Sequence, residues 1–201
     1  MDLFAGCVDR TLANGLAWLN EPPEWAFDEE GLTIVPKVHT DFFRPYGGTP
    51  QDGAGLLYTE ATGDFTVRTH VRAELLAFGD AGALTVRASA EQWLKLCVER
   101  SPIGDVSLVS VVTNVWSDDA NNELLDEPAC HLRVTRKGDV FGMHYSLDGR
   151  TWRFVRTLGF ALPETVMVGV HAQAPFHGGC RATFSGLHLT AEPVADFRSG
   201  E

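Results

Sequence analysis

Hydrophobic and polar residues alternate along most of this chain with a period of two, the pattern of strands that bury one face. The alternation is clearest in residues 64–73 and 92–100, where mainly apolar side chains alternate with mainly polar ones. Residues 106–116 are rich in β-branched side chains, which also favour a strand. Together these patterns predict strands at residues 32–38, 55–59, 64–73, 83–88, 92–100, 106–116, 131–136, 141–147, 152–158, 166–172 and 181–190.

Turn-forming residues separate these strands at short intervals. Asp148-Gly149 provides the positive-φ positions of a tight hairpin, and Lys137-Gly138-Asp139 is expected to join two antiparallel strands. Helix is expected only as a turn or two within residues 9–19 and at residues 91–92, and residues 118–128 are expected to form an acidic, exposed loop. Many short strands with regular turns predict an all-β sandwich or barrel.

Composition narrows the class of protein. The chain has 201 residues, of which 44% are hydrophobic, enough for one globular domain. Its net charge of −11 repels phosphate backbones and anionic lipids, which argues against nucleic-acid and membrane partners. Residues 1–10 lack the basic leader and apolar run of a signal peptide, so a cytoplasmic protein is expected. In that compartment free thiols are the expected state of the four scattered cysteines, Cys7, Cys97, Cys130 and Cys180.

A series of short motifs carries a family resemblance. The motifs are Trp18-Leu19-Asn20-Glu21-Pro22-Pro23-Glu24-Trp25, Asp41-Phe42-Phe43 with Tyr46-Gly47, Gly63-Asp64-Phe65, Trp93-Leu94-Lys95 with Glu99, Ser110-Val111-Val112-Thr113-Asn114 with Ser117-Asp118, Tyr145-Ser146-Leu147-Asp148-Gly149 with Trp152, and Val168-Gly169 with Ala174-Pro175. Their order and spacing resemble the regulation-of-enolase-like family, also called domain of unknown function 1349. The resemblance covers residues 16–190.

The resemblance implies a fold and a place for a ligand. The family is similar to the concanavalin A-like lectins and glucanases, which implies a jelly-roll sandwich of two antiparallel sheets with carbohydrate bound on the concave sheet. This agrees with the all-β class that the alternation predicts independently. We therefore expect a sandwich domain at residues 16–190, with an N-terminal extension at residues 1–15 and a C-terminal tail at residues 191–201.

The polar faces of the predicted strands supply candidate ligand-binding residues. Indole faces stack on sugar C–H surfaces, while carboxylates, amides and guanidinium groups bind hydroxyl groups. If these faces share one sheet, the ligand-binding residues are Arg87, Trp93, Lys95, Glu99, Asn114, Arg133, His144, Ser146, His171 and Gln173. The equally weighted alternative is that they are ordinary solvated strand residues.

Catalytic and metal sites have weaker support in the sequence. Glycoside hydrolysis needs two carboxyl groups, and a pair from Glu99 and Asp118 across strands is the candidate, with His144 as a further catalytic candidate. Two histidines, His144 and His171, with Glu99 form a conceivable divalent-metal site if their strands are adjacent. A Ca²⁺ site from Asp118, Asp119, Asn121 and Glu123 competes with the simpler interpretation of an acidic surface. No metal or cofactor is expected.

Three functions remain open at this point. The first is a non-catalytic domain that binds a sugar or another small polar ligand on the concave sheet. The second is a protein-interaction module that regulates a metabolic enzyme, as the name of the resembled family implies. The third is a glycoside hydrolase or lyase. An enzyme is the less favoured class, and no oligomeric state is assigned.

Overall fold

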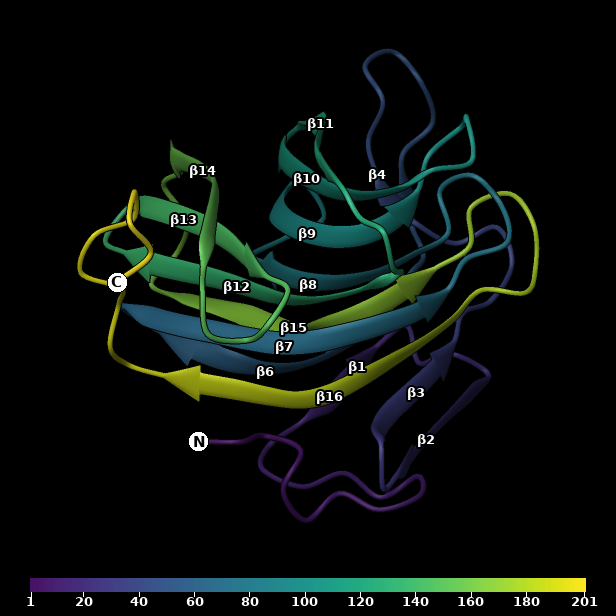
Figure 1. Cartoon of the computed structure of the whole chain (residues 1–201), viewed down its shortest axis with the longest axis horizontal. Helices are drawn as coiled ribbons and strands as arrows, with labels where there is room; N and C mark the ends of the chain where they lie inside the picture. The colour runs from purple at the N-terminus through teal and green to yellow at the C-terminus, as the bar shows by residue number, and fades with distance from the viewer.

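Two antiparallel seven-stranded sheets pack face to face in the computed structural model, which describes all residues 1–201 (Figure 1). The strands are β1 (Ala17–Leu19), β2 (Glu24–Asp28), β3 (Gly31–Val35), β4 (Phe42–Phe43), β5 (Gln51–Asp52), β6 (Gly55–Thr62), β7 (Phe65–Glu74), β8 (Ala81–Arg87), β9 (Gln92–Arg100), β10 (Val106–Asn114), β11 (Trp116–Leu124), β12 (Ala129–Lys137), β13 (Val140–Ser146), β14 (Arg153–Gly159), β15 (Thr165–Gln173) and β16 (Arg181–Thr190). The predicted all-β jelly-roll sandwich is confirmed.

The two sheets differ in the strands that they contain. The front sheet has the order β1-β6-β15-β8-β9-β10-β11, and the back sheet has the order β14-β13-β12-β7-β16-β3-β2. A short hairpin of β4 and β5 forms a third, two-stranded sheet. Figure 1 shows that β8, β9 and β10 are curved and that the segment through β4 rises beside them.

The main hydrophobic core lies between the sheets because alternate side chains of each strand point inward. Val86 and Leu94 of the front sheet and Val67 and Leu132 of the back sheet are fully buried members of this core. The inward positions of β7 and β9 are those that the alternation predicts. No helix of the structure has the length and apolarity that crossing a membrane requires.

A second, smaller hydrophobic cluster lies on the outer face of the front sheet. Its centre is Phe42 of β4, which packs against Trp93 of β9 with 6.1 Å between ring centroids. Residues 40–54, which carry β4 and β5, therefore cover part of a sheet face that alternation alone would leave to solvent. This covering segment, called the strap below, decides which outer side chains become buried.

Two local predictions are wrong. Residues 9–19 and 91–92 form no helix; residues 9–19 form bridges, turns and strand β1. Residues 118–128 are not simply a loop, because residues up to Leu124 belong to edge strand β11. The chain reverses at Val115, whose φ is +69°, instead of continuing a strand through Trp116. That turn has no glycine to indicate it; Val115 instead donates its N–H to Glu91 O and accepts from Arg44 Nε.

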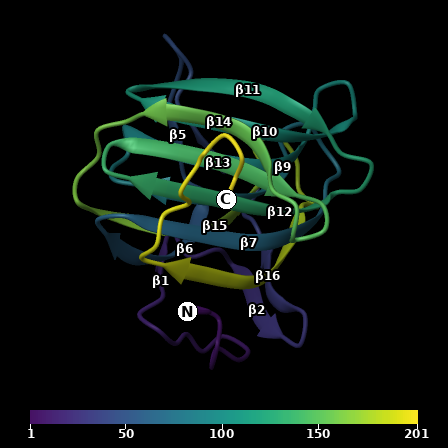
Figure 2. The same ribbon diagram turned by 60° about the vertical axis from the view of Figure 1, so that its left-hand side comes forward.

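Both terminal segments lie against the sandwich. Leu3 and Phe4 are buried members of the main core, and Asp2 forms an isolated bridge with His188 of β16. At the other end, residues 191–201 fold back over the outer face of the back sheet, in front of β12 and β13 in Figure 2. The N-terminal segment thus contributes to the main core, and the C-terminal segment covers the back sheet.

Candidate functional site

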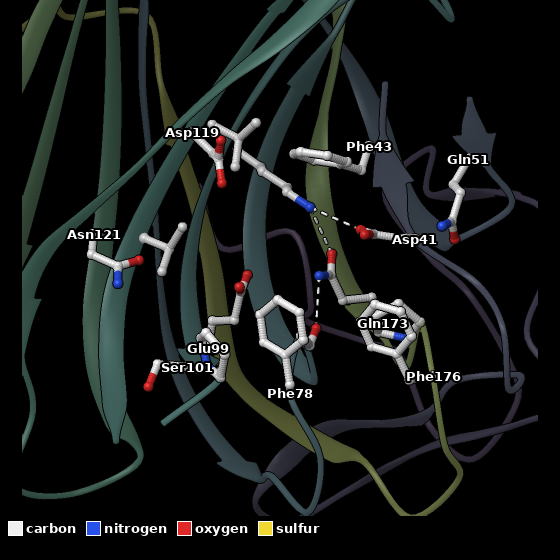
Figure 3. A pocket seen from close by; sticks show the side chains of 16 residues that line it. Asp41, Phe43, Gln51, Phe78, Glu99, Ser101, Asp119, Asn121, Gln173 and Phe176 are labelled. Atoms are coloured by element: carbon white, nitrogen blue, oxygen red, sulfur yellow. Dashed lines mark hydrogen bonds and ion pairs between the residues drawn. The ribbon is translucent and has the colours of Figure 1, made fainter. Parts of the chain in front are cut away.

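A cavity of about 370 Å³ lies on the outer face of the front sheet, beside the strap (Figure 3). Glu99 of β9 and Asp119 and Asn121 of β11 line one side of it. Asp41 and Gln51 of the strap line the opposite side. The phenyl rings of Phe43, Phe78 and Phe176 also line the cavity. Carboxyl, amide and aromatic groups thus face one small space, as in many ligand sites.

Strand register places the polar groups of this cavity. Lys95 pairs with Val111, which pairs in turn with Asp119 on β11. Because side chains alternate along a strand, all three point to the outer face, and so does Glu99 four residues beyond Lys95. The cavity is therefore built on the odd-numbered side chains of β9, which the alternation places on this face, and on β11, which the sequence predicts as a loop.

Lys95 forms the polar centre beneath the cavity. Its ammonium group donates to Asp41 Oδ1 at 2.9 Å, to the carbonyl of Phe42 at 2.8 Å and to Gln173 Oε1 at 2.8 Å. Burial opposes the charge on this group, but Asp41 and the neighbouring acidic groups outweigh burial and raise the pKa of Lys95. The ammonium therefore stays charged and ties the strap to β9 and β15.

His171 supports this centre from below. Its Nδ1 lies 2.8 Å from Thr85 Oγ1 and its Nε2 lies 3.1 Å from Gln173 Oε1. Gln173 Nε2 donates to Gly79 O at 2.9 Å, which fixes Oε1 as an acceptor, so His171 carries its hydrogen on Nε2. Burial, with Lys95 nearby, lowers the pKa of His171 to about 3. This imidazole is neutral and positions Gln173.

Glu99 is the carboxyl group of the cavity with the strongest perturbation. Burial is the largest cause, and Asp41 and Asp119 add to it; Lys95 opposes them, and the net effect raises the pKa of Glu99 to about 7. Its side chain makes no hydrogen bond or ion pair within the protein. Near neutral pH, Glu99 can therefore donate or accept a proton, which is the property of a ligand-binding or acid–base carboxyl group.

Two exposed phenyl rings form the apolar part of the site. Phe78 and Phe176 stack with their centroids 5.3 Å apart and their planes at 17°. Gly79 makes this approach feasible, since its φ is +80° and an added Cβ would lie 2.6 Å from Pro175 Cγ. Both rings are nearly half exposed, at 45% and 46%, so part of each aromatic surface is open to a ligand.

The structure brings together only part of the predicted ligand-binding set. Lys95, Glu99 and Gln173 line the cavity. Arg87, Trp93 and His171 share the same sheet face but are buried, so they support the site without reaching a ligand. Trp93 lies under the strap and donates its indole N–H to Ala90 O, so its predicted role as a stacking platform is wrong.

The other four predicted residues lie elsewhere. Asn114 is on the opposite face of β10 by alternation. Arg133, His144 and Ser146 belong to the back sheet, where Arg133 donates to Gly200 O at 2.7 Å and His144 Nε2 lies 2.7 Å from Phe197 O. Ser146 donates to Asp148 in the following turn. The predicted convergence of all ten residues is therefore wrong, because β12 pairs with β7 and β13 pairs with β12, which places both strands in the back sheet and away from β15.

The predicted catalytic and metal groupings are corrected in the same way. Asp118 points away from the cavity and lies 3.7 Å from Arg156, so the second carboxyl group near Glu99 is that of Asp119. His144 lies on the other sheet from His171 and Glu99. Asp119 and Asn121 face away from Asp118 on β11, which divides the proposed Ca²⁺ ligands. The described residues contain no group of three or more His, Cys, Asp or Glu side chains suited to a metal ion.

Several residues of the cavity are absent from the ligand-binding set predicted from the sequence: Phe43, Gln51, Phe78, Ser101, Asp119, Asn121 and Phe176. Phe78 and Phe176 lie in connections between strands, where alternation carries no information about direction. The alternation could have placed Asp119 and Asn121 if residues 116–124 had been recognised as a strand. Their acidic and amide composition is unusual for a strand and concealed it.

The fold and the cavity define a concanavalin A-like β-sandwich with a ligand-sized cavity on its front sheet. The chain belongs to the family described as "Protein of unknown function (DUF1349)", which it matches over residues 18–192. It is 33% identical over 177 residues to Regulation of enolase protein 1 of Saccharomyces cerevisiae. The aligned residues cover 87% of this chain and 88% of that protein.

Solved structures share the architecture. A functionally unknown protein from Saccharomyces cerevisiae is similar with a TM-score of 0.83 at 31% identity, over 89% of this chain and 97% of that chain. The carbohydrate binding module CBM66 from Bacillus subtilis has a TM-score of 0.56 at 17% identity, over 88% and 95%. The GH43 protein BlXynB (K247S mutant) from Bacillus licheniformis has a TM-score of 0.73 at 15% identity, over 95% of this chain but only 39% of that enzyme. The latter two show a shared fold alone.

Proposed function

We propose that this protein binds a carbohydrate-like small ligand in the cavity of the front sheet. The observation that carries the proposal is the combination of the stacked phenyl rings of Phe78 and Phe176 with unpaired carboxyl and amide groups in one cavity. Sugars present an apolar C–H face and a ring of hydroxyl groups, which fit aromatic faces and fixed polar groups respectively. The similarity to a carbohydrate binding module supports this function by analogy of fold.

A glycan array followed by calorimetry tests the proposal. Simple sugars are expected to bind to the wild type, and Phe78→Ala and Phe176→Ala are each expected to weaken binding at least tenfold, about 1.4 kcal/mol. Phe154→Ala is the control, since Phe154 is a phenyl group on the back sheet. Unchanged affinity in both cavity variants, or equal loss in the control, would contradict the proposal.

The same sugars can separate binding from hydrolysis. Glu99, with a pKa of about 7, and Asp119 are the two carboxyl groups that a glycosidase would need. We expect binding without turnover of chromogenic glycosides. Release of the chromophore that Glu99→Gln abolishes would replace the binding function with a hydrolase.

A regulatory protein-interaction function is the second candidate. The observation that favours it is the name of the yeast relative, which spans most of this chain and points to the control of enolase. The test mixes purified enolase with this protein and measures complex formation by calorimetry and by size-exclusion chromatography. A stoichiometric complex would support this function, and two separate elution peaks with no heat of binding would exclude it.

A further inference from the structure

The one cation of the cavity is fully used inside the protein. An ammonium group has three hydrogen-bond donors, and those of Lys95 are taken by Asp41, Phe42 O and Gln173. Gln173 in turn donates one amide hydrogen to Gly79 O, and its amide group carries no charge. Neither group offers a free charged donor to a ligand, so the cavity has no means of neutralising a phosphate or a carboxylate.

The groups that remain unpaired in the cavity are mainly acceptors with negative charge. The side chains of Glu99, Asp119 and Asn121 form no hydrogen bond or ion pair with the rest of the protein. Because Asp41 balances Lys95, the carboxyl groups of Glu99 and Asp119 determine the charge of the space. In Figure 3 both lie on the same side of the cavity, Glu99 beside Phe78 and Asp119 further from that ring.

Two buried hydroxyl groups beside this pair are also unpartnered. Ser101 lines the cavity, is only 7% exposed, and has a side-chain oxygen with no hydrogen-bond partner. Ser107 lies opposite Glu99 on β10, is 1% exposed, and is likewise unpartnered. Buried polar atoms are normally satisfied, so the hydroxyl group of Ser101, which lines the cavity, indicates a place for an additional polar group.

We infer that the cavity selects a sugar-sized polyol that carries a primary ammonium group, an amino sugar, with the ammonium held by Glu99 and Asp119 and the C–H face on Phe78 and Phe176. This inference rests on the proposed carbohydrate-binding function and names the class of ligand. The phenyl rings contribute twice, since aromatic faces attract cations as well as C–H groups. Uronic acids and sugar phosphates are excluded by the same charges.

The inference has a pH signature. Burial raises the pKa of Glu99 to about 7, with Asp41 and Asp119 adding to the effect and Lys95 opposing it. Burial also raises the pKa of the nearby Cys97 thiol, which stays neutral. A bound ammonium favours the ionised form of Glu99, so binding below pH 7 releases a proton. Only the ionised fraction binds well, so affinity should rise roughly tenfold from pH 5.5 to pH 7.

Calorimetry with four probes tests the inference. The probes are 2-amino-2-deoxyglucose, 6-amino-6-deoxyglucose, glucose and glucuronate. At pH 7 at least one amino sugar is expected to bind tenfold or more tightly than glucose, with no binding of glucuronate. At pH 6 its heat should vary with the ionisation enthalpy of the buffer, as proton release requires.

Matched variants separate this inference from the proposed function. Glu99→Gln and Asp119→Asn should remove the preference for amino sugars, while Asp118→Asn, on the other face of β11, should retain it. If glucose binds as tightly as both amino sugars and Phe78→Ala loses this glucose binding, the inference is overturned and the proposed function stands. No binding of any probe would overturn both.

Discussion

At the scale of single residues, Glu99 is half-buried and has no hydrogen-bond or ion-pair partner in the protein. Its outer-face position is set by alternation along β9, but its environment is set by the strap and by Asp119, which come from other parts of the chain. A carboxyl group that is largely desolvated and has no partner costs stability, and such perturbed groups cluster at functional sites. Trp93, three side-chain positions along the same face, has the opposite outcome and is sealed under Phe42.

Glu99→Gln should stabilise the protein at alkaline pH and have little effect at acidic pH. The pKa of Glu99 is raised from 4.5 to about 7 on folding, so the folded state holds the proton more tightly and loses stability as pH rises through this window. The cost is complete about one pH unit above this pKa and amounts to about 3 kcal/mol. Urea denaturation at pH 4.5 and pH 8 measures it, and an equal effect of the substitution at both values would contradict the assignment.

At the scale of elements, the strap converts a flat sheet face into a cavity. Strands β4 and β5 pair only with each other, but the strap is joined to the front sheet by the bridge from Thr40 to Ala174 and by side-chain contacts. Lys95 bonds to Asp41 and to the Phe42 carbonyl within the strap, and Arg87 lies 4.6 Å from the Phe42 ring centroid. Strand β11 forms the other wall and depends on the turn at Val115, where a β-branched residue adopts positive φ.

Lys95→Met should destabilise the fold by about 3–5 kcal/mol, because it leaves the buried carboxylate of Asp41 without its partner. The double variant Lys95→Met/Asp41→Asn should recover part of this loss, since the unpaired charge is then absent. Chemical denaturation of the two single variants and the double variant forms the cycle. Strictly additive losses would show that the two groups do not interact.

At the scale of the whole molecule, the sequence predicts where the strands lie in the chain far better than which strands pair with each other. Periodicity is a local property, so the inward faces of β7 and β9 follow from it, and the motif order between Trp18 and Pro175 indicates the sandwich. Which strands share a sheet depends on long-range pairing that leaves no local signal. For this reason the outer faces of β9 and β13 look equivalent in sequence, yet His144 and Lys95 lie on different sheets.

The candidate site shows the same division between local and long-range information. Lys95, Glu99 and Gln173 were within reach of the alternation argument. Phe78 and Phe176 were not within its reach, because they lie outside strands and 98 residues apart in the sequence. Their rings stack where Gly79 packs closely against Pro175. The aromatic part of the site therefore required the structure.

The most direct test of the central claim is an NMR titration that maps where a sugar binds. The ¹⁵N-labelled protein is titrated with the tightest-binding sugar of the array, or with the amino sugars and glucose at millimolar concentration. Amide shifts are expected to change at Phe78, Phe176 and along the Glu99 and Asp119 segments, while β12 to β14 of the back sheet stay unchanged. Changes centred on Arg133 and His144, or no changes at all, would contradict a ligand site in the cavity of the front sheet.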